Sequence, residues 1–484
     1  MYKSTRGKET VTASYAITHG ISEDGGLYVK TAWPKALFLG VLPKLEYQEI
    51  AVEVLKYFLD DFNEDELRQI VSQTYSEDAF PEKIVGLDPL GDDYLLTLFH
   101  GPTFAFKDMA LQMFSSLLKL AKIKSNETKK TIILSATSGD TGSAVLSGFA
   151  QDRETEIIIF YPEGKVSSFQ EKQMHYFSNE LRRTIAIQGN FDDCQNLIKQ
   201  GFQEIELENA QFSSANSINI ARIIPQVVYY FYAYKLLVER HKISFGDKID
   251  FVVPTGNFGN ILAGYYAKKM GLPIDKLVVA SNDNHVLTEF FKEGIYDRRR
   301  KFIQTSSPSM DILISSNLER LLYELLDEKE SAIRFFMSKL KEDGFYQLEN
   351  LTHPVLSTFL SGWANEQTVL ETVLATYTKY HVLVDPHTAV AIQVRNSLRN
   401  QMKSKVAVIV STASPIKFTS AMILGLKEKI QGSFEDEIKL LHQKYHLSID
   451  KRIYNYMNTS VNKVLWTKEN ALTNLKKLVG EIDV

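Results

Sequence analysis

From residue 131 onward, short runs of apolar and β-branched residues alternate with stretches of helical periodicity. Six runs read as buried strands, at residues 131–134, 157–160, 184–187, 249–253, 277–279 and 406–410. A turn and then a helical pattern follow each run, which is typical of βα units around mainly parallel sheets. Ligands on such sheets bind at the carboxyl ends of the strands. We therefore predict an α/β chain whose chemistry lies in the loops after these strands.

The pattern divides the chain into three regions. Residues 1–90 mix a Gly25-Gly26 turn with helical periods, which predicts an N-terminal α+β domain. Residues 91–430 contain the alternation and read as a catalytic region of two α/β subdomains, the smaller at about 130–210. Residues 431–484 are charged and helical, which predicts a C-terminal helical extension.

Composition excludes several classes of protein. A formal net charge of −4 over 484 residues gives no basic excess for nucleic acid. No apolar stretch reaches the roughly 18 residues that a membrane helix needs. The N-terminus lacks the apolar core of a signal peptide, so we expect a cytoplasmic location. The single cysteine, Cys194, forms no intramolecular disulfide, and the acids beside it favour an inert thiol. The basic run at 298–301 reads as solvated loop charge.

One candidate reactive group is Lys107. It follows the Gly101-Pro102 turn and aromatic Phe106, and an apolar helix is expected directly after it. Burial and the positive end of a helix both lower the pKa of an ammonium group, which suits a lysine that forms a Schiff base. The alternative is a solvated lysine at a helix end.

A loop rich in small and hydroxyl residues follows the expected strand at 131–134. It comprises Thr137, Ser138, Gly139, Asp140, Thr141 and Gly142. Its exposed backbone N–H groups suit a carboxylate or a phosphate. The Asp140 carboxylate would repel an anion and is expected to face a hydroxyl donor instead. An ordinary βα turn with N-cap hydroxyls is the alternative.

A glycine-bearing loop follows the expected strand at 249–253. It comprises Gly256, Asn257, Phe258, Gly259 and Asn260. Two glycines three residues apart let backbone N–H groups turn inward as a phosphate cup that needs no lysine or arginine. The loop is neither a dinucleotide fingerprint nor a P-loop. A plain βα turn is the alternative.

A third candidate anion site is the segment with Asn216, Ser217 and Asn219, where a helix should begin. Arg222 lies one turn further on and carries a planar fork suited to phosphate. The alternative is a capped helix with a surface arginine. The histidines show no metal-ligand spacing, so no metal is expected.

These segments, in this order, resemble the threonine synthases, a family of fold-type II pyridoxal-phosphate (PLP) enzymes related to the tryptophan synthase β fold. The resemblance covers nearly the whole chain. It includes Ser4 to Gly7, Asp24 to Val29, Phe99 to Asp108, Pro308 to Ile312 and Asp385 to Ala389.

The resemblance implies a role for each candidate. Lys107 would carry PLP as a Schiff base and move protons at the substrate. The cofactor-binding residues would be Lys107, Asp140, Gly256, Asn257, Phe258, Gly259, Asn260 and Thr412. The residues that bind the substrate would be Thr137, Ser138, Gly139, Thr141, Lys165, Asn216, Ser217 and Arg222. The hydroxyl of Thr412 would face the pyridine nitrogen.

The implied reaction converts O-phospho-L-homoserine and water to L-threonine and phosphate. Two alternatives stay open: a phospho-lyase that yields a 2-oxo acid, and a non-catalytic threonine-synthase-like binding protein. A small-molecule substrate is expected, and the chain could be a monomer or a homodimer. Two positions depart from the family pattern, Ser414 where His is expected and His285 where Asp is expected.

Overall fold

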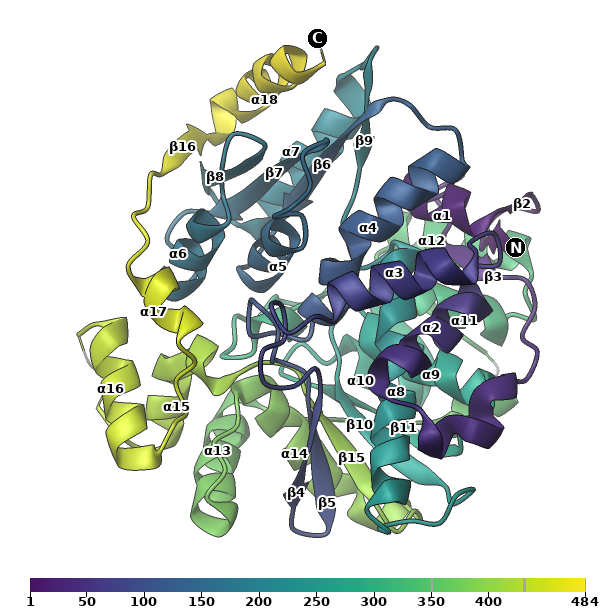
Figure 1. Cartoon of the computed structure of the whole chain (residues 1–484), viewed down its shortest axis with the longest axis vertical. Coiled ribbons are helices and arrows are strands. Elements are labelled where there is room, and N and C mark those ends of the chain that lie inside the picture. The colour runs from purple at the N-terminus through teal and green to yellow at the C-terminus, as the bar shows by residue number, and fades with distance from the viewer. Residues whose placement is uncertain (350, 430–431, 484) are drawn as a thin grey trace.

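The computed structural model describes residues 1–349, 351–429 and 432–483. Two parallel sheets, each flanked by helices, form the body of the molecule (Figure 1). No helix in the described ranges is long and apolar enough to cross a membrane.

The larger sheet has six strands in the order β14-β11-β10-β15-β5-β4. These strands are β4 (Gly86–Leu90), β5 (Asp93–Thr97), β10 (Ile249–Pro254), β11 (Ile274–Ser281), β14 (Phe359–Trp363) and β15 (Ala407–Ser411). All neighbours pair in parallel except β4, which forms a hairpin with β5. The boundary expected at residue 90 therefore falls inside a hairpin. Pro89 hid this strand in the sequence, since an edge strand tolerates proline and a central one does not.

The smaller sheet has five strands, all parallel, in the order β16-β8-β7-β6-β9. These strands are β6 (Lys130–Ala136), β7 (Thr155–Pro162), β8 (Arg182–Gln188), β9 (Ala210–Ser213) and β16 (Val464–Thr467). β16 comes from the C-terminal region, which therefore contains a strand as well as helices. The expected boundary at 430/431 lies outside the described residues.

Helices cover both faces of the sheets. Those of the N-terminal region and of the larger sheet are α1 (Ala13–His19), α2 (Tyr47–Phe58), α3 (Glu64–Thr74), α4 (Asp108–Lys124), α8 (Ile220–Glu239), α9 (Gly259–Lys269), α10 (Val286–Glu293), α11 (Leu318–Leu325), α12 (Glu330–Glu342), α13 (Glu366–Tyr380), α14 (Pro386–Leu398) and α15 (Thr419–Gly425). Those around the smaller sheet and at the C-terminus are α5 (Asp140–Gly148), α6 (Ser168–Tyr176), α7 (Phe191–Glu204), α16 (Phe434–Tyr445), α17 (Arg452–Met457) and α18 (Lys468–Ile482).

The remaining elements are short. They are β1 (Tyr2–Ser4), β2 (Thr10–Val11), β3 (Tyr28–Lys30), β12 (Ile295–Asp297), β13 (Phe345–Gln347) and the 3₁₀ turns η1 (Leu37–Lys44), η2 (Pro308–Met310), η3 (Pro354–Thr358), η4 (Arg399–Gln401) and η5 (Pro415–Phe418). β1, β2 and β3 form a small antiparallel sheet near the N-terminus.

Alternate residues of a buried strand supply two different cores. In β10, Phe251 and Val253 pack with the core around α8 and α9, whereas Val252 packs with that around α13 and α14. A strand buried on both faces has no polar face, which is why these segments read as continuous apolar runs.

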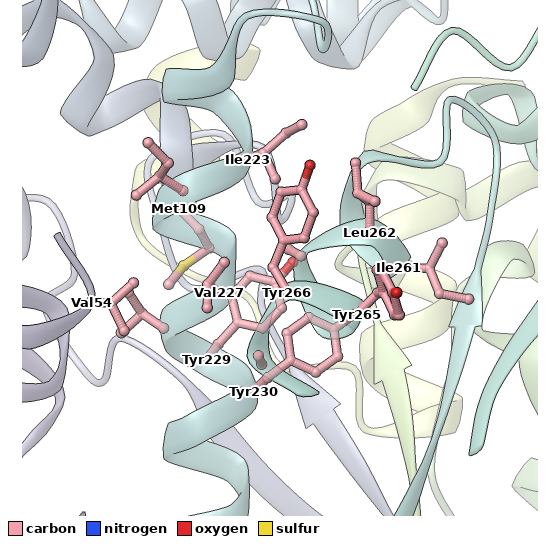
Figure 2. Packing of buried hydrophobic residues seen from close by; sticks show 14 of the residues in the cluster. Val54, Met109, Ile223, Val227, Tyr229, Tyr230, Ile261, Leu262, Tyr265 and Tyr266 are labelled. Carbon is pink, nitrogen blue, oxygen red and sulfur yellow. The ribbon is translucent and has the colours of Figure 1, made fainter. Parts of the chain in front are cut away.

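Four tyrosines and their neighbours fill the interface between α8 and α9 (Figure 2). Tyr229 and Tyr230 of α8 are fully buried and both donate their hydroxyls to Asn260 Oδ1, at 2.7 and 2.8 Å. Because Asn260 lies in the first turn of α9, this packing fixes the start of that helix and the loop before it.

Candidate functional site

A cleft of about 2180 Å³ is lined by loops of both sheets. It includes the segments that follow the carboxyl ends of six parallel strands, β6, β7, β8, β9, β10 and β15. The sequence-predicted residues that line it are Lys107, Thr137, Ser138, Thr141, Lys165, Asn216, Ser217, Arg222, Gly256, Asn257, Phe258, Gly259, Asn260 and Thr412. Gly139 and Asp140 are buried behind this surface. The tertiary structure thus brings nearly all of the candidates to one place.

Lys107 lies at the N-cap of α4 and is 9% exposed. Its ammonium Nζ donates to Ser309 Oγ at 3.1 Å and to Asp140 Oδ2 at 3.3 Å. Burial lowers the pKa of Lys107; Asp140 opposes this, and the positive charge of Lys417 adds to it. The alternative of a solvated lysine is therefore wrong.

Asp140 begins α5 and is 4% exposed. Its Oδ2 accepts from the hydroxyl of Ser309 at 3.2 Å, which is the hydroxyl donor expected from the sequence. Its Oδ1 lies 2.8 Å from the Lys417 ammonium and accepts from Gln170 Nε2 at 3.0 Å. Burial alone would raise the pKa of Asp140, but the positive charges of Lys417 and Lys107 hold this pKa well below its usual range.

The loop from Gly256 to Asn260 turns directly into α9. Phe258 is the N-cap with φ 64°, and its side chain accepts no hydrogen bond from the helix, so the first N–H groups of α9 stay available. A Cβ on Gly259 would meet nothing closer than Asn317 Nδ2 at 3.5 Å, which leaves open space beside these N–H groups. The geometry is that of a cup for an anion at a helix N-terminus.

The segment at 216–217 lies against this loop. The side chain of Asn317 donates to the carbonyl oxygens of Ser217 at 3.1 Å and Asn257 at 2.9 Å. Asn216 and Asn257 are exposed toward the cleft, whereas Ser217 is half-buried. The two candidate anion sites are therefore neighbours, held together by one amide.

Arg222 is 4% exposed in the first turn of α8, whose N-cap is Asn219. The alternative of a surface arginine is therefore wrong. Its Nη1 donates to the carbonyl oxygen of Ala215, while its buried Nε has no partner among the described residues. Burial lowers the pKa of Arg222 to about 10, still well above neutral pH. A buried, charged guanidinium with a free N–H suits an anionic ligand.

The loop after β6 is organised by Thr137. Its Oγ1 accepts from the N–H groups of Gly139 and Gly142, both at 2.9 Å. Gly139 has φ 128°, a conformation that disfavours any side chain. Ser138 and Thr141 are half-buried and line the same cleft as Lys107.

Two further candidates lie at different depths. Thr412 follows β15 and is 5% exposed, and its carbonyl oxygen accepts from Phe106 N at 2.8 Å, next to Lys107. Lys165 is exposed at the mouth of the cleft. Lys165 thus lines the cleft from an exposed position, and Thr412 from a buried one.

Sequence reasoning missed four polar side chains around Lys107. Gln170, Gln173 and Lys417 were not singled out, and Ser309 was noted only as part of a family segment. Ser309 N donates to His387 Nε2 at 3.2 Å, and His387 Nδ1 then donates to Asp385 Oδ1 at 2.7 Å. Lys417 follows an apolar strand and a proline, a pattern that surface lysines share, so no local signal could have singled it out.

The two departures from the family pattern differ in their distance from the candidate groups. Ser414 uses its N–H to hold Phe104 O at 3.0 Å, beside the Lys107 loop. His285 stacks on Trp363 at 4.3 Å and pairs with Glu289 at 3.2 Å. His285 is not part of the cleft lining, and in the described ranges no group of three His, Cys, Asp or Glu side chains could hold a metal.

Comparisons with known proteins agree with this geometry. Residues 1–75 match the family model "Threonine synthase N terminus", and residues 92–336 match "Pyridoxal-phosphate dependent enzyme". The threonine synthase of Eremothecium gossypii is 34% identical over 98% of each chain. Human threonine synthase-like 1 is 39% identical over 86% of this chain and 58% of that protein. The PLP-bound threonine synthase from Brucella melitensis has a TM-score of 0.86 and 33% identity over 99% of each chain.

Proposed function

The chain belongs to the threonine synthase family of PLP-dependent enzymes, and from this premise we propose that it converts O-phospho-L-homoserine and water to L-threonine and phosphate. The predicted fold class and cofactor class are those of the family. One observation carries the proposal most directly: a buried lysine faces a cleft that also holds two separate candidate anion sites. The reaction needs both sites, because cofactor and substrate each carry a phosphate.

The residues present fit PLP. The uncapped start of α9 and the open space at Gly259 suit its phosphate, and Lys107 suits its aldehyde. The buried Nδ2 of Asn260 has no partner among the described residues, so it is free to donate toward that phosphate. Bound PLP supplies the electron sink for removing protons next to the substrate's amino-bearing carbon. We assign Thr412 to the ring nitrogen, and Asp140 and Asn257 to the surroundings of the ring oxygen.

The substrate would lie across the same cleft. The hydroxyls and N–H groups of the loop 137–141 would hold its carboxylate. Arg222, Asn216, Ser217 and Lys165 would hold its phosphate, with Arg222 supplying a fixed charge. Once its amine is free, Lys107 would move protons at the α and β carbons of the substrate, a task that requires an uncharged amine near neutral pH. Its depressed pKa supports this role.

Product identity tests the reaction. Incubation of the purified chain with O-phospho-L-homoserine should release phosphate and threonine in equal amounts. A 2-oxo acid in place of threonine would indicate the phospho-lyase, because that enzyme omits water addition at the β carbon. Binding without any phosphate release would indicate the non-catalytic protein.

Cofactor attachment tests the site. Borohydride reduction should fix PLP on one peptide, the one that contains Lys107, and Lys107→Ala should abolish turnover. Lys417→Arg serves as a control for a neighbouring lysine, since it leaves Lys107 in place. PLP found on another lysine would overturn the assignment.

The cytoplasmic location, the absence of nucleic-acid binding and the choice between monomer and homodimer stay predictions from the sequence.

A further inference from the structure

A second buried lysine, Lys417, lies behind Lys107. Its side chain is fully buried, in η5 directly after the loop that carries Thr412. Its ammonium Nζ contacts three acceptors: Asp140 Oδ1 at 2.8 Å, Thr103 O at 2.8 Å and Gln173 Oε1 at 3.2 Å. An ammonium group has three N–H donors, so each donor has an acceptor.

These acceptors come from three different parts of the fold. Thr103 belongs to the loop that carries Lys107, Asp140 begins α5 and Gln173 lies in α6. The last two elements flank the smaller sheet, whereas η5 follows the larger one. Lys417 therefore joins both sheets at the point where Lys107 projects into the cleft.

The charges at this point do not balance. Two ammonium groups, Lys107 and Lys417, share the one carboxylate of Asp140. Lys417 has the shorter contact, 2.8 Å against 3.3 Å, and two further acceptors. Among the described residues, Lys107 has one further hydrogen-bond acceptor, the Ser309 hydroxyl. A buried charge is costly unless it is paired and hydrogen-bonded. The proton is therefore lost most easily from Lys107.

We propose that Lys417 is a positioning residue: its fixed charge engages Asp140 and leaves Lys107 as the amine that gives up its proton. The idea rests on the proposed function, in which Lys107 acts as a base once it is free of the cofactor. In this proposal the charge of Lys417 has a role beyond holding loops together. A neutral side chain of similar size would pack between the same elements without favouring the neutral form of Lys107.

Three other titratable groups lie near Lys107, on α8, α14 and α4. Arg222 on α8 adds a positive charge that lowers the pKa of Lys107 further. His387 on α14 accepts from Ser309 N through Nε2 at 3.2 Å, and its other ring nitrogen contacts Asp385 Oδ1 at 2.7 Å. Burial raises the pKa of Asp108 on α4 to about 6. The carboxyl oxygens of Asp108 accept from Thr103 N and Thr103 Oγ1, both at 2.7 Å.

The test is the titration of Lys107 itself. The full-length chain, freed of PLP, is labelled with trace acetic anhydride across a pH series, and the Lys107 peptide is quantified by mass spectrometry. In the wild type the apparent pKa of Lys107 should lie clearly below the ordinary value of about 10.4. In Lys417→Met it should rise by about 1 to 3, the usual effect of one neighbouring charge. Lys417→Arg should keep it near the wild-type value.

The loaded enzyme provides a second readout. The acid limb of its kcat–pH profile should move to higher pH in Lys417→Met, since Lys107 must lose a proton to act as a base. At a fixed pH on that limb, a rise of one in the pKa of Lys107 lowers the deprotonated fraction of Lys107 about tenfold. A merely structural role for Lys417 would lower kcat evenly at every pH.

Lys235→Met is the matched control. Lys235 is also buried, at 3% exposure, but its partners are Glu46 and Glu239, outside the cleft lining. This variant should leave the pKa of Lys107 unchanged. An unchanged pKa of Lys107 in folded Lys417→Met overturns the proposal. If that variant does not fold, the wild-type titration decides, because an ordinary pKa of Lys107 there overturns the proposal too. Borohydride labelling elsewhere would instead refute the proposed function.

Discussion

At the scale of single residues, a variant of Arg222 can distinguish the substrate-phosphate site from the cofactor-phosphate site. It lies on α8, whereas the glycine loop leads into α9. A charge-assisted hydrogen bond is worth about 1.5–3 kcal/mol, which corresponds to roughly 10- to 150-fold. Arg222→Ala should therefore lower kcat/KM for O-phospho-L-homoserine by at least that order, with PLP content unchanged.

Arg222→Lys is the control, because it keeps the charge and loses the planar fork. Its kcat/KM should lie between those of the wild type and Arg222→Ala. Loss of PLP in proportion to activity would assign Arg222 to the cofactor or to the fold. Full activity of Arg222→Ala would remove it from the substrate site.

Gly256 and Gly259 should respond differently to substitution. A Cβ on Gly256 would lie 2.5 Å from the carbonyl oxygen of Ser309, so the backbone itself requires glycine there. A Cβ on Gly259 meets only Asn317 Nδ2 at 3.5 Å. Gly259→Val should therefore weaken PLP binding in a folded protein, whereas Gly256→Ala should also lower the melting temperature. PLP titration and thermal denaturation measure the two effects. Normal PLP affinity in Gly259→Val would show that the loop is not the cup.

At the scale of elements, the short helix α17 holds the loop that carries Lys107. Arg452 Nη2 donates to His100 O at 3.1 Å, and its guanidinium lies 4.9 Å from the Phe104 ring centroid. The hydroxyl of Tyr456 donates to Pro102 O at 2.8 Å. The far end of α17 accepts from Lys172 of α6 through Met457 O at 2.7 Å. The C-terminal region thus supports the reactive loop and does not merely cover it.

Variants of α17 should change turnover through that loop. Tyr456→Phe removes one hydrogen bond, worth about 0.5–1.5 kcal/mol, and should lower kcat by no more than about tenfold. Arg452→Met removes more contacts and should have the larger effect. Tyr454→Phe is the control on the same helix, since Tyr454 is 52% exposed. Unchanged kcat in folded Arg452→Met would show that α17 stabilises the fold only.

At the scale of the whole molecule, the reactivity of Cys194 measures whether the helices that cover the smaller sheet remain packed on it. It is fully buried on α7, in a cluster that includes Leu475 of α18. Burial first, and then Asp193, raise the pKa of Cys194 from 9.0 to about 12. The reactive thiolate is the deprotonated form, so a raised pKa makes the thiol less reactive at neutral pH.

Alkylation of the single cysteine should therefore be slow in the native chain. At pH 8 the raised pKa alone lowers the thiolate fraction about 1000-fold. Iodoacetamide labelling, followed by intact mass, should be slow in buffer and fast in denaturant. Leu475→Ala should accelerate it, because a buried Leu→Ala change costs about 2–5 kcal/mol and loosens α18. Equal rates in the native and unfolded chain would contradict the buried position of Cys194.

The sequence alone determined most of the site because its signals are local. A buried strand is a continuous apolar run, and the loop after it contains the turn residues and hydroxyls that mark a ligand site. The six expected strands correspond to β6, β7, β8, β10, β11 and β15. The loops 137–141 and 256–260 follow expected strands, whereas Lys107 was singled out by its Gly-Pro turn, the aromatic residue before it and the apolar helix after it. The carboxyl ends of parallel strands meet at one edge of a sheet, where ligands bind.

Only the tertiary structure decided the contacts between distant segments. β16 pairs with β8 although about 280 residues separate them. Its run Val464–Thr467 lies between two lysines in a charged, helical region and is largely exposed, so it lacks the buried apolar pattern of the other strands. The ion pair of Lys417 with Asp140 joins residues from opposite sheets, and neither position differs locally from a surface lysine or a helix-start aspartate. Whether a charged side chain is solvated or buried depends on what the fold places around it. For that reason the sequence could single out Lys107 as a candidate, but only the three-dimensional arrangement showed that it shares the Asp140 carboxylate with Lys417.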